Sequence, residues 1–233
     1  MFYIFPKKIE FNPSQTKWSL QSISSLLLIV ALDEIRLLPD YEKSALYGHI
    51  RQLIKKAKAL EIPIIELKTS EPQNAMVLLG QYLSPESQLV MTGLVNPQFK
   101  QIMQYMRSVT DKICVVEDAI LLPGPEQHIQ WINTISQEHI HHINTYNLTR
   151  LWALSAPTHL IMSSKGILLA IAEQLDIDAL EINPEVNLRE YGLDSVAMVS
   201  LIGLWRANGA NITYEDLLEN NSLIKLFNFL KIT

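Results

Sequence analysis

The sequence has a single cysteine, Cys114, so no disulfide can form within the chain. Cys114 lies in the apolar run 113–116, where we expect it to fill a buried strand. The longest apolar run, 26–32, is too short to cross a bilayer. Residues 1–8 lack the basic start and apolar stretch of a signal peptide. These absences predict a soluble, cytoplasmic protein.

Charged residues are also few, at 18% of the chain against 48% hydrophobic residues, which argues against a long disordered tail. The charges are unevenly distributed. From Pro157 onward there are ten acidic and five basic residues, whereas the preceding part is balanced. This acidic C-terminal third argues against nucleic acid as a partner and favours proteins with basic surfaces.

The first two thirds of the chain alternate between strand and helix patterns. The predicted strands are 26–32, 62–67, 88–92, 112–117 and 140–145, and the predicted helices are 42–60, 97–108 and 126–136. Such alternation indicates a parallel sheet with helices on both faces. We assign residues 1–150 to this α/β domain and residues 151–162, which include Pro157, to a linker.

Residues 163–233 show no strand pattern and predict a small all-α bundle of four helices. The first helix is expected to start at a cap, Ser163 or Ser164, and to run to Leu175. A long irregular loop, 176–194, follows it. The other predicted helices are 195–207, 214–219 and 222–230.

A serine stands where the long loop meets the second of these helices, in the segment Gly192-Leu193-Asp194-Ser195. Gly192 permits a turn, and Leu193 can anchor the loop in the bundle. A hydroxyl at a helix N-terminus is exposed and lies where backbone N–H groups and the helix dipole favour a phosphate. An ordinary helix cap is the alternative interpretation.

Residues 163–230 resemble the acyl and aryl carrier proteins of nonribosomal peptide and siderophore assembly. The resemblance rests on Gly192-Leu193-Asp194-Ser195-Val196, on 187–188 upstream and on 205–209 downstream. It implies that Ser195 carries a covalent 4′-phosphopantetheine, within a motif completed by Gly192, Leu193 and Asp194. The chain would then be a phosphoprotein, and the thiol at the end of its phosphopantetheine would hold an acid as a thioester.

The same resemblance implies that partner enzymes contact the start of the second helix and the short third one. The implied surface residues are Val196, Val199 and Tyr214. For Val199 and Tyr214, a place in the bundle core is the alternative.

The N-terminal part resembles a shortened isochorismatase, on the basis of Lys17-Trp18 and of 26–29, 62–65 and 90–94. In siderophore pathways that make 2,3-dihydroxybenzoate, an isochorismatase is fused to an aryl carrier domain in this order. The catalytic aspartate of that family falls here on Ala31, which cannot transfer a proton. Asp33 could replace it through a register slip, but the segment that bears the family's lysine is missing before 88–92. We expect a pseudoenzyme with no catalytic residue, since each lost acid or base costs about 10²- to 10⁴-fold in rate.

Two further clusters carry weaker signals. In the cluster His139, His141 and His142, the first and second would share one face of a strand, as two metal ligands could. An exposed edge strand explains the cluster equally, and we predict no metal site. Glu117-Asp118 would end a strand at the edge where α/β sheets bind ligands, although a solvated strand end is the simpler interpretation.

These observations predict an aryl carrier protein for 2,3-dihydroxybenzoate or salicylate. The implied partners are a phosphopantetheinyl transferase, an aryl-acid adenylating ligase and a condensation or cyclisation domain, and the isochorismatase resemblance also suggests a homodimer. Two alternatives stay open: an active bifunctional isochorismatase and carrier, and a carrier for an amino or aliphatic acid in another nonribosomal pathway.

Overall fold

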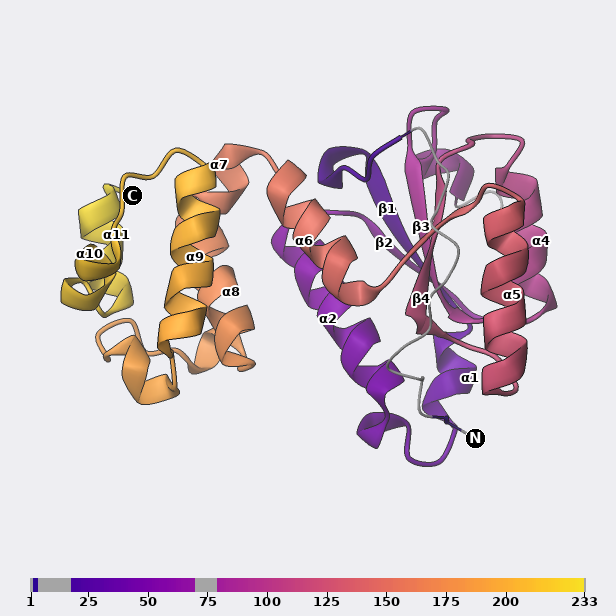
Figure 1. Cartoon of the computed structure of the whole chain (residues 1–233), viewed down its shortest axis with the longest axis horizontal. Coiled ribbons are helices and arrows are strands. Elements are labelled where there is room, and N and C mark those ends of the chain that lie inside the picture. The colour runs from indigo at the N-terminus through magenta and orange to yellow at the C-terminus, as the bar shows by residue number, and fades with distance from the viewer. Residues whose placement is uncertain (1, 4–17, 70–78, 233) are drawn as a thin grey trace. The chain divides into compact units, whose positions relative to one another are not determined.

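The computed structural model describes residues 2–3, 18–69 and 79–232. The chain divides into two compact units, Met1–Trp152 and Ala153–Thr233. The first unit combines a sheet with helices and the second is helical, which confirms the predicted fold class (Figure 1). Among the described helices, none is both long and apolar enough to cross a membrane.

A five-stranded sheet forms the centre of the first unit, in the order β2-β1-β3-β4-β5. All of its strand pairs are parallel. The strands are β1 (Ser25–Val30), β2 (Ile64–Leu67), β3 (Gln88–Leu94), β4 (Ile113–Leu121) and β5 (His141–Ile143).

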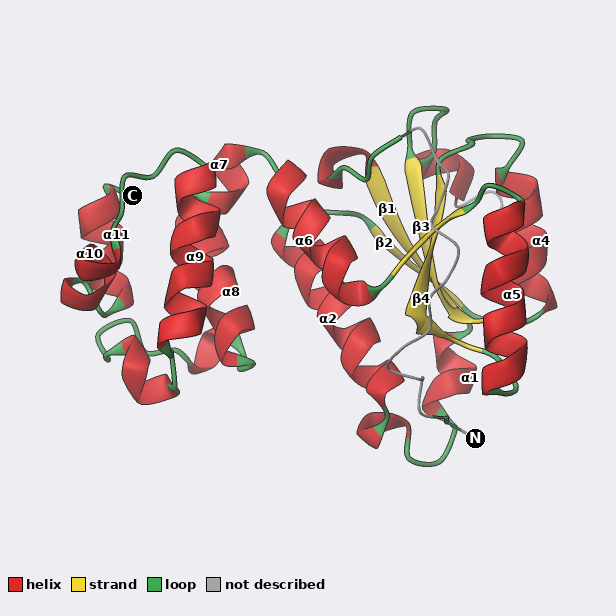
Figure 2. Cartoon of the chain, in the orientation of Figure 1, coloured by secondary structure: helices red, strands yellow, loops and turns green. Residues whose placement is uncertain are grey.

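Helices cover both faces of this sheet, with α2 and α6 on one face and α4 and α5 on the other (Figure 2). The helices are α1 (Leu32–Arg36), α2 (Ala45–Ala59), α4 (Pro97–Met106), α5 (Pro125–Gln137) and α6 (Thr145–Ser155), with 3₁₀ turns at Ser22–Ser24 and Tyr41–Lys43.

Strand β1 is apolar at nearly every position because both of its faces are buried. Leu26, Leu28 and Val30 belong to one buried cluster with residues of α4 and α5. Side chains alternate along a strand, so Ser25 faces the other side, where its hydroxyl accepts a hydrogen bond of 2.9 Å from the Trp152 indole in α6. A central parallel strand is therefore buried on both faces.

The range predicted as a linker, 151–162, is mostly helical. Helix α6 runs into this range, and α7 (Thr158–Ile161) follows. Leu148 and Trp152 of α6 are fully buried, so packing holds the helix in place. Pro157 precedes the first residue of α7 with φ −57°, a value that suits a helix start.

The second unit contains the helices that the sequence predicts, with nearly the same limits. They are α8 (Ser164–Leu175), α9 (Ser195–Ala207), α10 (Tyr214–Glu219) and α11 (Leu223–Leu230), and the long loop adds 3₁₀ turns at Ala179–Glu181 and Leu188–Tyr191. Ser163 caps α8 by accepting the Gly166 N–H at 2.9 Å. The core is apolar and includes Ile167, Ile171, Met198, Leu201, Trp205, Leu217 and Leu226.

The first unit should lose stability in acid because of His128. Burial lowers the pKa of His128 from 6.5 to about 4, although its hydrogen bond to the Glu117 carbonyl and the nearby charge of Asp118 partly oppose this shift. A histidine whose folded-state pKa is lowered contributes stability above its unfolded pKa and loses it as pH falls from 6.5 towards 4. Between pH 7 and pH 5 this amounts to about 2 kcal/mol.

Denaturant unfolding at a series of pH values tests this expectation with His128→Gln. The variant should bind about one proton fewer on unfolding, so its stability should fall less steeply below pH 6.5. If the stability of His128→Gln falls with pH as steeply as that of the unchanged protein, His128 is not a buried neutral group in the folded state.

Candidate functional site

The end of the long loop places Ser195 at the surface. Gly192 has φ +97°, a left-handed conformation that suits glycine. Leu193 then turns inward and is only 3% exposed. The Asp194 side chain accepts the Ala197 N–H at 2.8 Å and so caps α9. Ser195 follows as the first residue of the helix and is exposed.

The cap therefore belongs to Asp194 and not to Ser195, which removes the interpretation of Ser195 as the capping residue. Its hydroxyl is left available for other chemistry at the N-terminus of α9, where the helix dipole favours a negative charge.

Backbone hydrogen bonds fix the loop beneath this serine. The Leu188 N–H donates to the Asn221 carbonyl at 2.8 Å, and the Leu193 N–H donates to the Leu188 carbonyl at 3.2 Å. Asn187 starts the 3₁₀ turn by accepting the Arg189 N–H at 3.0 Å. The segment that leads to Ser195 is thus held by one hydrogen bond to Asn221 and closed by one within the loop.

Tyr214, the first residue of α10, lies against this serine. Its hydroxyl donates a hydrogen bond to the Ser195 Oγ at 3.2 Å. A reciprocal capping box fixes the start of α10, since Thr213 accepts the Asp216 N–H while the Asp216 carboxylate accepts the Thr213 N–H. The sequence singled out Tyr214 for a partner surface, but nothing in it predicted this contact.

Helix α9 separates its apolar residues into two sets. Met198, Leu201, Ile202 and Trp205 are buried in the bundle. Val196 and Val199 are 78% and 60% exposed, so Val199 does not lie in the core. Tyr214 is half-buried. Exposed valines one turn apart, beside an exposed serine, form an apolar surface with no partner in the bundle.

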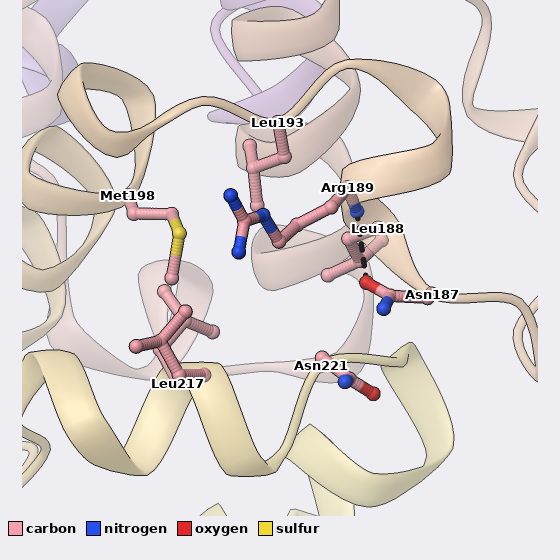
Figure 3. A pocket seen from close by; sticks show the side chains of 8 residues that line it. Asn187, Leu188, Arg189, Leu193, Met198, Leu217 and Asn221 are labelled. Carbon is pink, nitrogen blue, oxygen red and sulfur yellow. Dashed lines mark hydrogen bonds between the residues drawn. The ribbon is translucent and has the colours of Figure 1, made fainter.

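A small pocket opens on the inner side of the same loop (Figure 3). Its lining is apolar at Leu193, Met198 and Leu217, while Asn187, Arg189 and Asn221 supply polar groups. Leu188 and Leu218 complete the lining. The motif residue Leu193 thus contributes one wall of the pocket.

The N-terminal unit places Ala31 at the end of β1, which stops at Val30 and not at the predicted Leu32. Ala31 is fully buried and left-handed, with φ 54°. Asp33 lies beyond the strand, in α1. One of its carboxylate oxygens is screened from solvent and has no hydrogen-bond partner among the described residues. Lys17, part of the resemblance to isochorismatases, lies outside the described residues.

Glu117 and Asp118 lie inside β4, not at its end, because the strand continues to Leu121 through an irregularity in its pairing with β3. Glu117 makes a 2.9 Å hydrogen bond through its carboxylate with Nδ1 of His142 on β5. Asp118 accepts hydrogen bonds from the Thr145 N–H and hydroxyl at 2.8 and 2.7 Å. These contacts tie β4 to β5 and α6, so the solvated strand end was a wrong prediction.

The histidine cluster does not have the predicted geometry. His139 lies before β5 in a left-handed turn with φ 60°, so it shares no strand face with His141. Burial, with a smaller effect of His142, lowers the pKa of His141 to about 4. Within the described ranges, no group of three or more His, Cys, Asp or Glu residues could hold a metal ion.

The comparison with protein families bears on the second unit. Residues 165–230 match the family model described as the phosphopantetheine attachment site. The match spans α8 to α11 and includes the exposed serine at the start of α9. This part of the chain is therefore a carrier domain, to which 4′-phosphopantetheine is attached covalently.

Proposed function

We propose that Ser195 is the attachment residue and that the chain is an aryl carrier protein of nonribosomal siderophore assembly. The observation that carries the first part is the geometry of the α9 start, where Asp194 provides the cap and leaves the adjacent hydroxyl exposed within the matched region. The aryl assignment is supported by the order of the two units, since a parallel α/β unit, whose sequence resembles a shortened isochorismatase, precedes the carrier domain.

Attachment requires a transferase that uses coenzyme A. The Ser195 oxygen forms a bond to the phosphorus that bears pantetheine, the pyrophosphate bond breaks, 3′,5′-ADP leaves and the serine proton passes to a base. Loading follows when a ligase converts an aryl acid and ATP into an aryl adenylate and pyrophosphate. The thiol then displaces AMP to give the thioester, and the tether raises the effective concentration of the acid at the next enzyme.

Val196, Val199 and Tyr214 are the proposed contact surface for these enzymes, followed by a condensation or cyclisation domain. Exposed apolar side chains next to the attachment point would be covered in each complex. The acidic balance of the carrier region favours partners with basic rims. The N-terminal unit, with Ala31 in place of an acid, would serve as a non-catalytic scaffold.

A loading experiment tests the aryl assignment. The holo protein is offered in parallel to an aryl-acid ligase, an aliphatic acyl ligase and an amino-acid-adenylating domain, each with its own acid, and the thioester is followed by intact mass. We expect the aryl ligase to load it on the order of ten times faster or more, because partner selection rests on differences in surface contacts. Faster aliphatic or aminoacyl loading would contradict the siderophore assignment.

The same assay tests the contact surface through Val199→Asp, which should slow loading by roughly tenfold because it places a charge at an apolar contact. Ile224→Asp is the matched control, since Ile224 is an exposed apolar residue on α11 outside the proposed surface. Equal effects of both changes would speak against a specific role for Val199.

Asp33 gives a second candidate function some support. A carboxylate oxygen that is screened from solvent and unpaired, just beyond the end of a central strand, has the surroundings of a general acid or base. Isochorismate hydrolysis by the full chain, absent in Asp33→Asn, would establish a bifunctional enzyme. Our proposal expects no hydrolysis by either protein.

A further inference from the structure

The contact between Tyr214 and Ser195 joins two parts of the carrier domain that the sequence separates by 19 residues. Leu217, one turn along α10, is 1% exposed and anchors that helix in the bundle. The capping box holds its first turn. The tyrosine hydroxyl is therefore presented to the serine from a fixed support and not from a flexible loop.

The direction of this hydrogen bond matters for chemistry at Ser195. The tyrosine donates, so it occupies one lone pair of Oγ and leaves the second lone pair and the serine proton free. An exposed serine otherwise samples several χ1 rotamers, and a hydrogen bond from a fixed donor favours one of them. The geometry thus orients the nucleophile without blocking it.

Once Ser195 is modified, Oγ becomes an ester oxygen, and a charged phosphate oxygen lies two bonds away, on the other side of the phosphorus. A hydroxyl donor bonds more strongly to an ionised oxygen than to a neutral one. The tyrosine hydroxyl that holds Ser195 in the free protein is thus within reach of the better acceptor in the modified one.

We propose that Tyr214 is a positioning residue for phosphopantetheine: its hydroxyl orients Ser195 before transfer and binds the phosphodiester afterwards. This rests on the proposed role of Ser195. In the transfer, the Ser195 oxygen bonds to phosphorus, 3′,5′-ADP leaves with the electrons of the broken P–O bond, and the serine proton passes to the transferase. Tyr214 neither gains nor loses a proton and only changes its acceptor.

Tyr214→Phe tests this proposal because it removes the hydroxyl and keeps the ring. With a promiscuous phosphopantetheinyl transferase and coenzyme A, kcat should fall about five- to tenfold, the effect of one lost hydrogen bond, while the KM for the carrier stays within about twofold. The ³¹P resonance of the modified protein should also shift, because the phosphodiester loses its hydroxyl donor.

Tyr191→Phe is the matched control. The Tyr191 hydroxyl accepts the Asn183 N–H at 2.9 Å in the same domain, so this change also removes one tyrosine hydrogen bond. It should leave kcat and the ³¹P resonance as in the unchanged protein. A ring contact to the transferase would instead raise the KM in Tyr214→Ala and leave Tyr214→Phe unaffected.

The outcomes separate the two proposals. If the unchanged, folded protein acquires no phosphopantetheine, or acquires it at a residue other than Ser195, the proposed function fails. If Ser195 is modified but Tyr214→Phe matches Tyr191→Phe in both kcat and the ³¹P resonance, only the role of the Tyr214 hydroxyl is overturned.

Discussion

Replacing Gly166 with alanine is expected to unfold the carrier domain and to abolish its modification. Gly166 lies in the first turn of α8, where an added β-carbon would be 2.0 Å from the Leu160 carbonyl oxygen and 2.7 Å from that of Ile161. Both are backbone atoms, so no side-chain rotation relieves the clash. The cost should be about 3 kcal/mol or more, comparable to the whole stability of a domain of this size.

Gly203→Ala is the control for this prediction. Gly203 lies in α9, and a β-carbon there meets nothing within 4 Å. Alanine is the better helix former by about 1 kcal/mol, so this variant should be slightly more stable. Hydrogen exchange of peptides from α8 to α11 in the full chain measures both effects. Native protection of these helices in Gly166→Ala would contradict the packing of α7 against α8.

The carrier domain could be predicted from the sequence in some detail because its signals are local. A serine cap, a glycine in a left-handed turn and an aspartate before an apolar helix each fix the backbone within a few residues. Helices α9 and α10 therefore have the predicted limits. The assignment of the cap to Asp194, by contrast, depends on which side chain reaches the Ala197 N–H, and residue types do not decide this.

The sheet of the first unit was also predictable, because short apolar runs that alternate with helix patterns along the chain indicate parallel strands buried on both faces. The linker was not. Helix α6 is held by Trp152, whose indole donates to Ser25, 127 residues earlier in the chain. A contact between residues so far apart in the chain cannot be inferred from a local sequence pattern. Pro157 directly precedes α7, and a proline is compatible with the start of a helix.

The remaining polar contacts were missed for the same reason. Glu117 meets His142, and Tyr214 meets Ser195, only because strands or helices distant in sequence are brought together. Sequence reasoning identified Glu117 and Tyr214 as residues of interest but not their partners. For the histidines, the expectation that His139 shares a strand face with His141 was wrong, because His139 lies in a left-handed turn before β5.

The proposed function depends on phosphopantetheine attachment at Ser195, and intact mass spectrometry tests this attachment most directly. The full chain, Ser195→Ala and Ser200→Ala are each incubated with coenzyme A and a promiscuous phosphopantetheinyl transferase. Ser200 is the control because it is an exposed serine on the same helix. The unchanged chain and Ser200→Ala should each gain one phosphopantetheine, and Ser195→Ala should gain none. A gain in Ser195→Ala, or no gain in the folded unchanged chain, would contradict the assignment.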